Sequence, residues 1–264
     1  MPIARDGTGA TLVTGTGVGT ATITFTTTAS RHLVVLAGAH SNSASDPRPT
    51  SISDSGSGSW TVKSKLATVG AGAGINASFV AYSENRAAIT SVTFNFNTSN
   101  YFHLKLDQYS GVKSSGSFDV QQDAEGAVST NAWSSGNLTA SDPNCLIVGA
   151  AAGDDSANST WTAPGGSWTE TFQYGDTNTN TAAEGVFQIA AGSTGPFSAT
   201  FTYLGMSAGG YAGVSTLVSF LPSVSGGKTP FIFPLAADER GETSEGTERG
   251  EPFSVQRFGR LSRW

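Results

Sequence analysis

The sequence predicts an all-β protein, an antiparallel β-sandwich or jelly roll made of two internally similar halves, with an extended C-terminal arm. Three observations support this fold class. Short segments alternate apolar and polar residues with a period of two, and small or turn-forming residues are abundant. Similar segments also recur about 108 to 113 residues apart. A period of two places apolar side chains on one face of a strand, whereas Gly reaches the positive φ angles of tight turns.

The first half contains two kinds of strand pattern. Residues 21–26 place Ala21, Ile23 and Phe25 on one face and Thr on the other, which predicts a half-buried strand. The apolar run Leu33–Ala37 predicts a central strand that is covered on both faces. Further strands are predicted at 59–62, 77–82, 91–96 and 103–109.

The second half repeats this order, with predicted strands at 145–148, 166–169, 186–189, 197–203 and 211–221. Three pairs of segments match: His32–Ala39 with Cys145–Ala152, Gly58–Thr61 with Gly166–Thr169, and Ser91–Phe94 with Ser198–Phe201. Their nearly constant spacing indicates an internal duplication. Two similar sheets could pack face to face or form adjoining sandwiches, and we predict one continuous two-sheet unit.

The domain organisation follows from these patterns. We predict an N-terminal segment with a first strand at 1–20, and a body at 21–222 with halves at about 21–113 and 136–222. A docking arm follows at 223–264, because a Ser/Gly linker there precedes segments that mix aromatic residues with Arg. The predicted partner-binding residues, called the arm anchors, are Phe231, Phe233, Phe253, Arg257, Phe258, Arg260, Leu261, Arg263 and Trp264.

The composition argues against several function classes. The net charge of −6 and pI of about 5.0 give no electrostatic footprint for nucleic acid. No apolar run approaches the ~20 residues that span a membrane, and the first residues lack the pattern of a signal peptide, so synthesis in a cytoplasm without export is expected. Cys145 is the single cysteine, which excludes an intrachain disulfide, and its apolar surroundings predict burial.

Catalytic motifs are not found, so a non-enzymatic protein without cofactor or metal is predicted. His32, His40 and His103 are the three histidines, and none has metal-ligand spacing or an HExxH context. No Gly-x-Ser-x-Gly elbow supports a serine nucleophile. The Gly-rich segment 15–19 lacks the Lys–Ser/Thr pair of a phosphate loop. A hydrolase is therefore the least favoured alternative.

Loop carboxylates are the next candidates. Asp46, Asp54, Asp154 and Asp155 fall in equivalent loops of the two halves. Such residues cap Asx-turns, which is the favoured interpretation, and they also bind Ca²⁺ together with backbone carbonyls. Asp154 and Asp155 could also take part in binding a glycan.

Tryptophans offer a second binding hypothesis. Trp60 and Trp168 occupy matching positions of the repeat, and we expect them to fill the core. Trp133 and Trp161 lie in polar surroundings, so their rings are candidates for stacking on sugars, as in a carbohydrate-binding module.

One family resemblance rests on four segments. After an apolar strand, the chain reads Ser-Asp-Ser-Gly-Ser-Gly-Ser-Trp-Thr at 53–61, Ala-Tyr at 81–82, Ile-Thr-Ser-Val-Thr-Phe at 89–94 and Leu-Asp-Gln-Tyr-Ser-Gly-Val at 106–112. This order resembles a recurring β-sandwich module of phage virion proteins and uncharacterised bacterial proteins, over about residues 20–220. The chain departs from that pattern in having Ser59 where Asn is common and Gln108 where Glu is common.

The resemblance implies a structural role in a virus particle. It favours a capsid decoration (cement) protein that clamps neighbouring subunits through its arm, with a tail or fibre component as an alternative. The implied partners are major capsid or tail proteins and copies of the chain itself, as a homo-oligomer within a larger assembly. The implied location is the virion. The shared motifs are structural and carry no catalytic residues.

Overall fold

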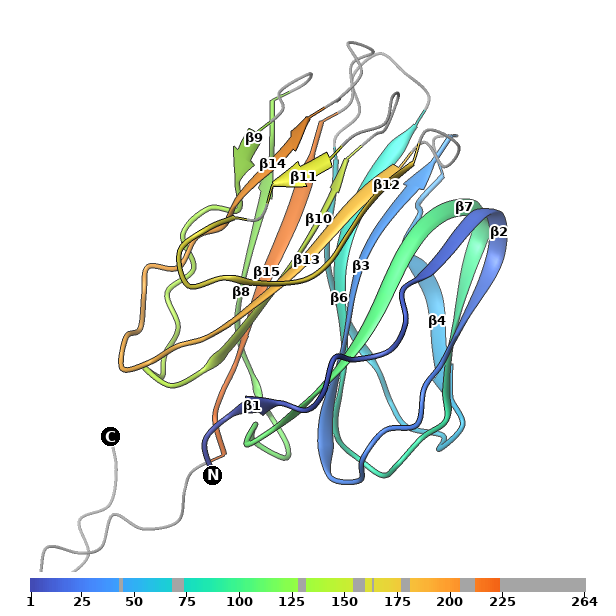
Figure 1. Cartoon of the computed structure of the whole chain (residues 1–264). Coiled ribbons are helices and arrows are strands. Elements are labelled where there is room, and N and C mark those ends of the chain that lie inside the picture. Colours follow the sequence, from blue (N-terminus) through green and yellow to red (C-terminus); the bar gives the residue numbers. More distant parts are fainter. Residues whose placement is uncertain are drawn as a thin grey trace, which may run out of the picture. The chain divides into compact units, whose positions relative to one another are not determined.

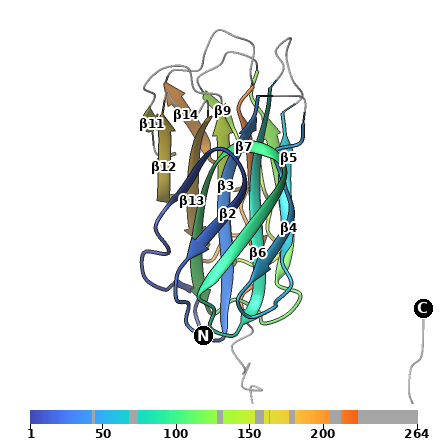
Figure 2. The same ribbon diagram turned by 90° about the vertical axis from the view of Figure 1, so that its right-hand side faces the viewer.

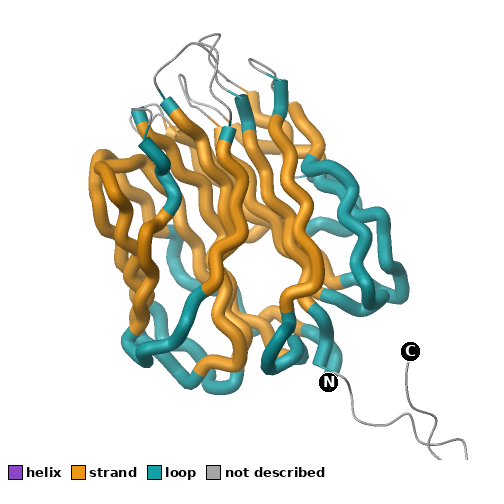
Figure 3. Tube along the Cα trace, turned by 180° about the vertical axis from the view of Figure 1, so that it is seen from behind, coloured by secondary structure: helices purple, strands orange, loops and turns teal. Residues whose placement is uncertain are grey.

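The computed structural model describes residues 1–42, 45–67, 74–127, 132–153, 160–162, 164–176, 181–204 and 212–223. Within these ranges every regular element is a β-strand, and the paired strands run antiparallel (Figures 1 and 3). Residues Met1–Ser225 form one compact unit. The predicted all-β class and antiparallel sandwich are therefore confirmed. The arm after residue 223 lies outside the described residues.

The first half is a single seven-stranded sheet. Its strands are β1 (Ala4–Arg5), β2 (Val13–Thr24), β3 (Arg31–Ser41), β4 (Pro49–Asp54), β5 (Thr61–Leu66), β6 (Ile75–Arg86) and β7 (Ser91–Ser110). The long strand β7 pairs with β4 near its beginning and with β3 near its end, while β2 pairs along both parts. The sheet consequently curls over itself, with β2 and β4 in front of β3 and β6 in Figure 2.

The second half contains two separate sheets. Its strands are β8 (Phe118–Glu125), β9 (Ala132–Ser134), β10 (Leu146–Gly153), β11 (Thr160–Thr162), β12 (Thr169–Asp176), β13 (Thr181–Ile189), β14 (Thr200–Leu204) and β15 (Val214–Phe220). The larger sheet has the order β12-β13-β10-β15-β8, and the smaller one has the order β11-β14-β9.

Strand order shows that the two halves repeat the same topology. The run β5-β6-β3-β7 of the first half corresponds to β12-β13-β10-β15 of the second. The beginning of β7, lying between β4 and β2, corresponds to β14 between β11 and β9. One strand thus serves both layers in the first half, whereas β14 and β15 share that role in the second.

Pairing also corrects the register of the repeat. Thr61 pairs with Tyr82, which pairs with Val34. In the second half Thr169 pairs with Phe187, which pairs with Val148. Val34 therefore corresponds to Val148, one residue away from the match drawn from sequence letters. The match drawn from sequence letters was therefore wrong by one residue. The difference matters because a slip of one residue moves every side chain to the opposite face of a sheet.

Among the described residues, the three largest of four hydrophobic clusters separate four layers of strands. The first core lies inside the curl of the first half and the second lies between the two sheets of the second half. The third joins the halves, which lie side by side in Figure 1. Strand β3 contributes Leu33 and Val35 to the first core and Val34 and Leu36 to the third, so the predicted central strand is confirmed. The predicted two-sheet unit is wrong, because each half builds its own sandwich.

Small side chains let the halves approach closely. A Cβ atom added at Gly38 of β3 would lie 2.5 Å from the Ala183 Cβ and 3.0 Å from the Ala152 Cβ. Across the same interface, the buried hydroxyls of Ser78 and Thr216 are 3.0 Å apart and share a hydrogen bond. Close packing and a buried polar contact together fix how the inner sheets meet.

Candidate functional site

The predicted binding residues have different outcomes. All nine arm anchors, from Phe231 to Trp264, lie outside the described residues, as do Asp154 and Asp155. Their proposed contacts stay predictions.

The burial of the four tryptophans differs from the prediction. Trp133 and Trp161 are each only 5% exposed, and their rings meet edge to face at 5.8 Å in the core of the second half. The indole Nε1 of Trp161 donates to the Tyr174 carbonyl oxygen at 3.0 Å. An exposed stacking platform is therefore wrong for this pair. Trp60 and Trp168 are half-buried and pack at the margins of their cores instead of filling them.

Asp54 forms a turn, in agreement with the favoured interpretation of this loop. Its fully buried carboxylate accepts hydrogen bonds from the Gly56 N–H (2.8 Å), the Gly58 N–H (3.1 Å), the Trp60 indole (2.8 Å) and the Arg86 guanidinium (2.9 Å). Burial alone would raise the Asp54 pKa, but these donors hold it below the usual value. The four donors occupy the carboxylate, so the turn explains the Asp–Gly–Trp spacing without a cation.

Asp46 is likewise engaged by a neighbouring residue. Both of its oxygens accept from Arg48, with the Oδ2 atom 2.6 Å from Nη2. Burial raises the Asp46 pKa, and the hydrogen bonds and charge of Arg48 more than offset this effect, so the pKa is lowered. Among the described residues, no group of three or more His, Cys, Asp or Glu side chains is arranged to hold a metal ion.

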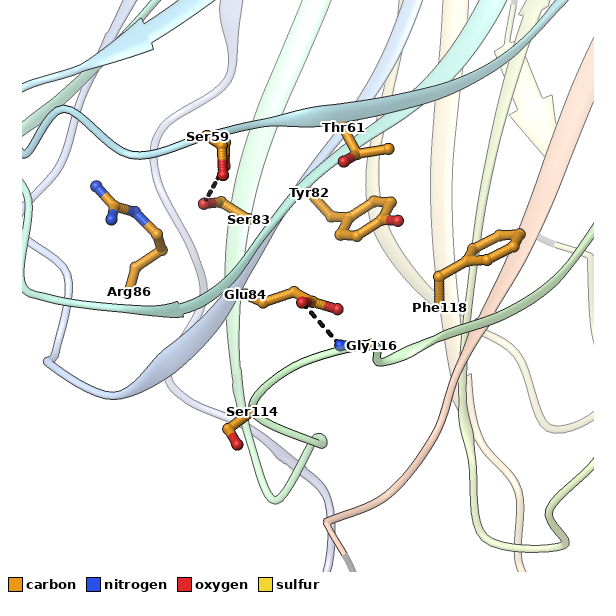
Figure 4. A pocket seen from close by; sticks show the side chains of 9 residues that line it. All are labelled: Ser59, Thr61, Tyr82, Ser83, Glu84, Arg86, Ser114, Gly116 and Phe118. Carbon is orange, nitrogen blue, oxygen red and sulfur yellow. Dashed lines mark hydrogen bonds between the residues drawn. The ribbon is translucent and has the colours of Figure 1, made fainter.

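A pocket of about 350 Å³ lies where the two halves meet, and we call it the seam pocket (Figure 4). The start of β5, the end of β6, the connection between the halves and the start of β8 form its walls. The residues that line it are Ser59, Thr61, Tyr82, Ser83, Glu84, Arg86, Ser114, Gly116 and Phe118. Sequence reasoning missed this site, because its parts are separated by up to 60 residues and the motif segments 53–61 and 81–82 that supply Ser59, Thr61 and Tyr82 indicated only a structural role.

The carboxylate of Glu84 is fixed inside the seam pocket. It accepts hydrogen bonds from the Gly116 N–H at 3.0 Å, and from the Ser117 N–H and hydroxyl at 2.6 Å each. Burial raises the Glu84 pKa, but the bonds from Ser117 and Gly116 outweigh it, so the pKa is lowered. The pocket therefore contains an ionised acceptor whose position is set by the backbone.

Aromatic rings lie beside this carboxylate. Tyr82 and Phe118 lie nearly parallel, with centroids 6.4 Å apart, and Lys63 Nζ lies 3.8 Å from the Phe118 centroid. Behind Tyr82, the ring of His32 stacks at 5.7 Å and is almost fully buried. Burial lowers the pKa of His32 to about 4, with Glu84 opposing that shift, so His32 is neutral at pH 7.

Acidification is expected to weaken this aromatic cluster. The pKa of His32 is about 4 in the folded protein and 6.5 as a model value, so its contribution to stability is complete above pH 6.5 and is lost as the pH falls toward 4. Between pH 7 and 4.5 the loss from this residue should be on the order of 2–3 kcal/mol. Urea unfolding of the protein and of His32→Leu at both pH values measures the difference. If the free energy of unfolding depended on pH equally in the two proteins, the assignment of this loss to His32 would be wrong.

A second polar feature lies inside the second half. Ala37 pairs with Phe79 and Leu104 in the first half, and the corresponding Ala151 pairs with Glu184 and Ser215. Glu184 is fully buried, and neither carboxylate oxygen has a hydrogen-bond partner; the Ser215 hydroxyl lacks one too. Burial, with a smaller contribution from Glu170, raises the Glu184 pKa to about 8. Two positions that hold apolar core residues in the first half thus hold polar residues in the second half.

The fold and these sites define a duplicated antiparallel β-sandwich with a polar pocket at the junction of its halves. No protein-family model, curated protein or solved structure matches the chain. No helix with the length and hydrophobicity to cross a membrane occurs in the part of the chain that the structure describes.

Proposed function

We propose that the chain is a non-enzymatic structural protein of a bacteriophage virion, of the capsid decoration type. In this proposal the duplicated body is a scaffold, and residues 223–264 clamp neighbouring capsid or tail subunits or further copies of the chain. The virion role comes from the family resemblance, and the arm's role comes from its aromatic and Arg anchors.

The observation that carries the proposal is the use of charged groups in the body. Asp54 and Arg86 hold a turn, Glu84 holds the connection between the halves, and Arg5 pairs with the buried Asp107 at 2.6 Å. These groups stabilise loops and strand ends, which is the role expected in a scaffold. Five of the nine arginines lie in the arm together with five aromatic residues, and there burial and bidentate contacts to carboxylates would supply binding.

The starting point of the arm also supports a clamp. The Ser223 N–H donates to the Gly111 carbonyl oxygen at 2.7 Å, and Val112 bridges to Pro222. The chain is therefore tied to the connection between the halves just before the arm begins. An arm with a fixed origin loses less entropy on binding than one that leaves a frayed end.

Co-sedimentation with phage particles purified from the natural source tests the proposal. The full chain should pellet with particles, and a full-length variant with Arg257, Arg260 and Arg263 changed to Ala should bind at least tenfold more weakly. A matched variant with Lys63 and Lys65 changed to Ala removes positive charge from the body and should bind normally. Failure of the full chain to bind, or equal binding by the arm variant, overturns the clamp.

A further inference from the structure

We propose that the seam pocket binds a neutral, hydroxyl-rich ligand, a mono- or disaccharide. This inference is independent of the clamp, because every residue it uses belongs to the body. It also differs from the sugar site expected from the tryptophans, since Trp133 and Trp161 are buried elsewhere.

The hydrogen-bonding capacity of the seam pocket favours a ligand rich in hydroxyl groups. A carboxylate has about four acceptor positions, and Glu84 uses three of them for Gly116 and Ser117. The Ser83 hydroxyl donates to the Ser59 carbonyl oxygen at 2.7 Å, so its lone pairs are oriented and can accept. Ser114 adds an exposed hydroxyl at the mouth. Such a mixture of fixed acceptors and rotatable hydroxyls suits sugar hydroxyls, which both donate and accept.

The charged groups in and beside the seam pocket favour a neutral ligand. An anion entering the pocket meets the ionised Glu84, while the nearest guanidinium, that of Arg86, is bound to Asp54 at 2.9 Å. A cation meets Arg86 in the lining and Lys63 over the ring of Phe118. An ion of either sign therefore enters beside a group of its own charge, and Arg86 is already bound to Asp54, whereas a neutral polar molecule is repelled by none of these groups.

The arrangement and volume of the seam pocket also match a sugar. Figure 4 shows Tyr82 and Phe118 on one side of the pocket and Glu84 with Ser83 beside them. A sugar ring has a similar division, because its faces carry C–H bonds that contact aromatic carbon and its rim carries hydroxyls that bind polar groups. The volume of about 350 Å³ lies at the lower end of the range for ligand pockets, roughly 300–1,000 Å³, and so suits one or two sugar rings.

The duplication provides an internal control. A pocket of about 260 Å³ occupies the matching turn of the second half, lined by Ser167, Trp168 and Gln188 among others. Ser167 corresponds to Ser59, and its hydroxyl donates to the Gln188 side chain at 2.8 Å. No charged residue lines this second pocket. A ligand that requires Glu84 should therefore bind only at the seam.

Ligand-detected NMR and calorimetric titration of the full chain test the inference. The probes are glucose, galactose, mannose, N-acetylglucosamine, maltose and lactose, with sialic acid and glucosamine as charged arms. At least one neutral sugar should bind saturably with a Kd of about 0.1–10 mM, at least tenfold more tightly than either charged arm. Glu84→Gln should weaken it about fivefold or more.

A matched pair of variants locates the site. Ser114→Trp fills the mouth from an exposed position and should abolish binding, whereas Ser167→Trp at the second pocket should leave the Kd unchanged. Unaltered thermal melting shows that each variant is folded. Absence of binding by every neutral sugar overturns the inference, as does unchanged affinity in Ser114→Trp. The arm variant should bind sugar normally, so this result is separable from failure of the clamp.

Discussion

Glu184→Gln is expected to stabilise the folded protein by on the order of 2–4 kcal/mol at neutral pH. Glu184 is fully buried on β13, and no residue donates a hydrogen bond to its carboxyl group. Keeping that group protonated at pH 7 costs free energy, because its pKa is about 8 in the folded protein against a model value of 4.5. Glutamine has nearly the same shape and no proton to retain, so the substitution removes this cost.

The pH dependence has a definite sign. The folded state binds more protons than the unfolded state between pH 4.5 and 8, so the contribution of Glu184 to stability is complete below pH 4.5 and is lost as the pH rises through 8. His32 acts in the opposite direction, since its contribution is lost on acidification. Differences between variant and parent isolate each residue from the other.

Urea unfolding at pH 5, 7 and 8.5 measures the effect. The gain in free energy of unfolding from Glu184→Gln should increase across this series. Glu170→Gln is the matched control. Glu170 lies on the neighbouring strand β12 and is half-buried, so its substitution should change the free energy of unfolding less, and with a weaker dependence on pH. A gain that does not change with pH, or a loss of stability at pH 8.5, would contradict the assignment.

The strands that sequence reasoning found are those with a strong apolar signal. Residues 33–37 lie in β3, and residues 146–148 of the predicted strand at 145–148 lie in β10; these are the central strands of the inner sheets. Strands β4 and β8 were not predicted, because β4 begins with Pro49 and is largely polar, and every residue of β8 is half-buried. Strand β7 was predicted as two strands, since the polar stretch 97–100 interrupts its pattern without ending its pairing.

The binding residues were harder to predict, for a physical reason. Trp133 looked exposed because its neighbours are polar, yet Ala132 and Ser134 point outward while the indole points into the core. That exposed–buried–exposed order is typical of a short strand over a core, but Ala-Trp-Ser does not show it as a polar–apolar alternation because Ala132 is apolar. The seam pocket left no local signal, because it forms only when the two halves pack together.

Duplication accounts for how polar groups could enter a well-packed β-body. The first half keeps Phe79 and Leu104 in its core, whereas the second half has Glu184 and Ser215 at the matching positions. The turn before the repeated Trp shows the reverse, since only the first half has the Asp54–Arg86 pair. Each half thus carries polar groups that its counterpart lacks, and of these Glu184 has a local cost in stability.

Asp54→Ala is expected to destabilise the protein by about 3–5 kcal/mol. The Asp54 side chain is fully buried and that of Arg86 is only 15% exposed, so the substitution leaves a guanidinium largely buried without its carboxylate. It also removes the acceptor for the Gly56 and Gly58 N–H groups and the Trp60 indole. Unsatisfied buried donors carry the full cost of desolvation.

A double-mutant cycle separates the charge from the turn. Arg86→Met alone leaves the carboxylate its three other donors, and the double variant Asp54→Ala/Arg86→Met should be less destabilised than the sum of the single variants. Urea unfolding followed by Trp fluorescence measures all three, because Trp60 donates directly to Asp54.

The pair Asp46–Arg48 is the matched control. Its side chains are about 40% exposed, at 41% and 39%, so solvent screens the interaction and Asp46→Ala should cost no more than about 1 kcal/mol. The buried turn is the stronger element only if Asp54→Ala costs clearly more than Asp46→Ala. Equal costs would mean that the Asp–Gly–Trp turn tolerates loss of its carboxylate.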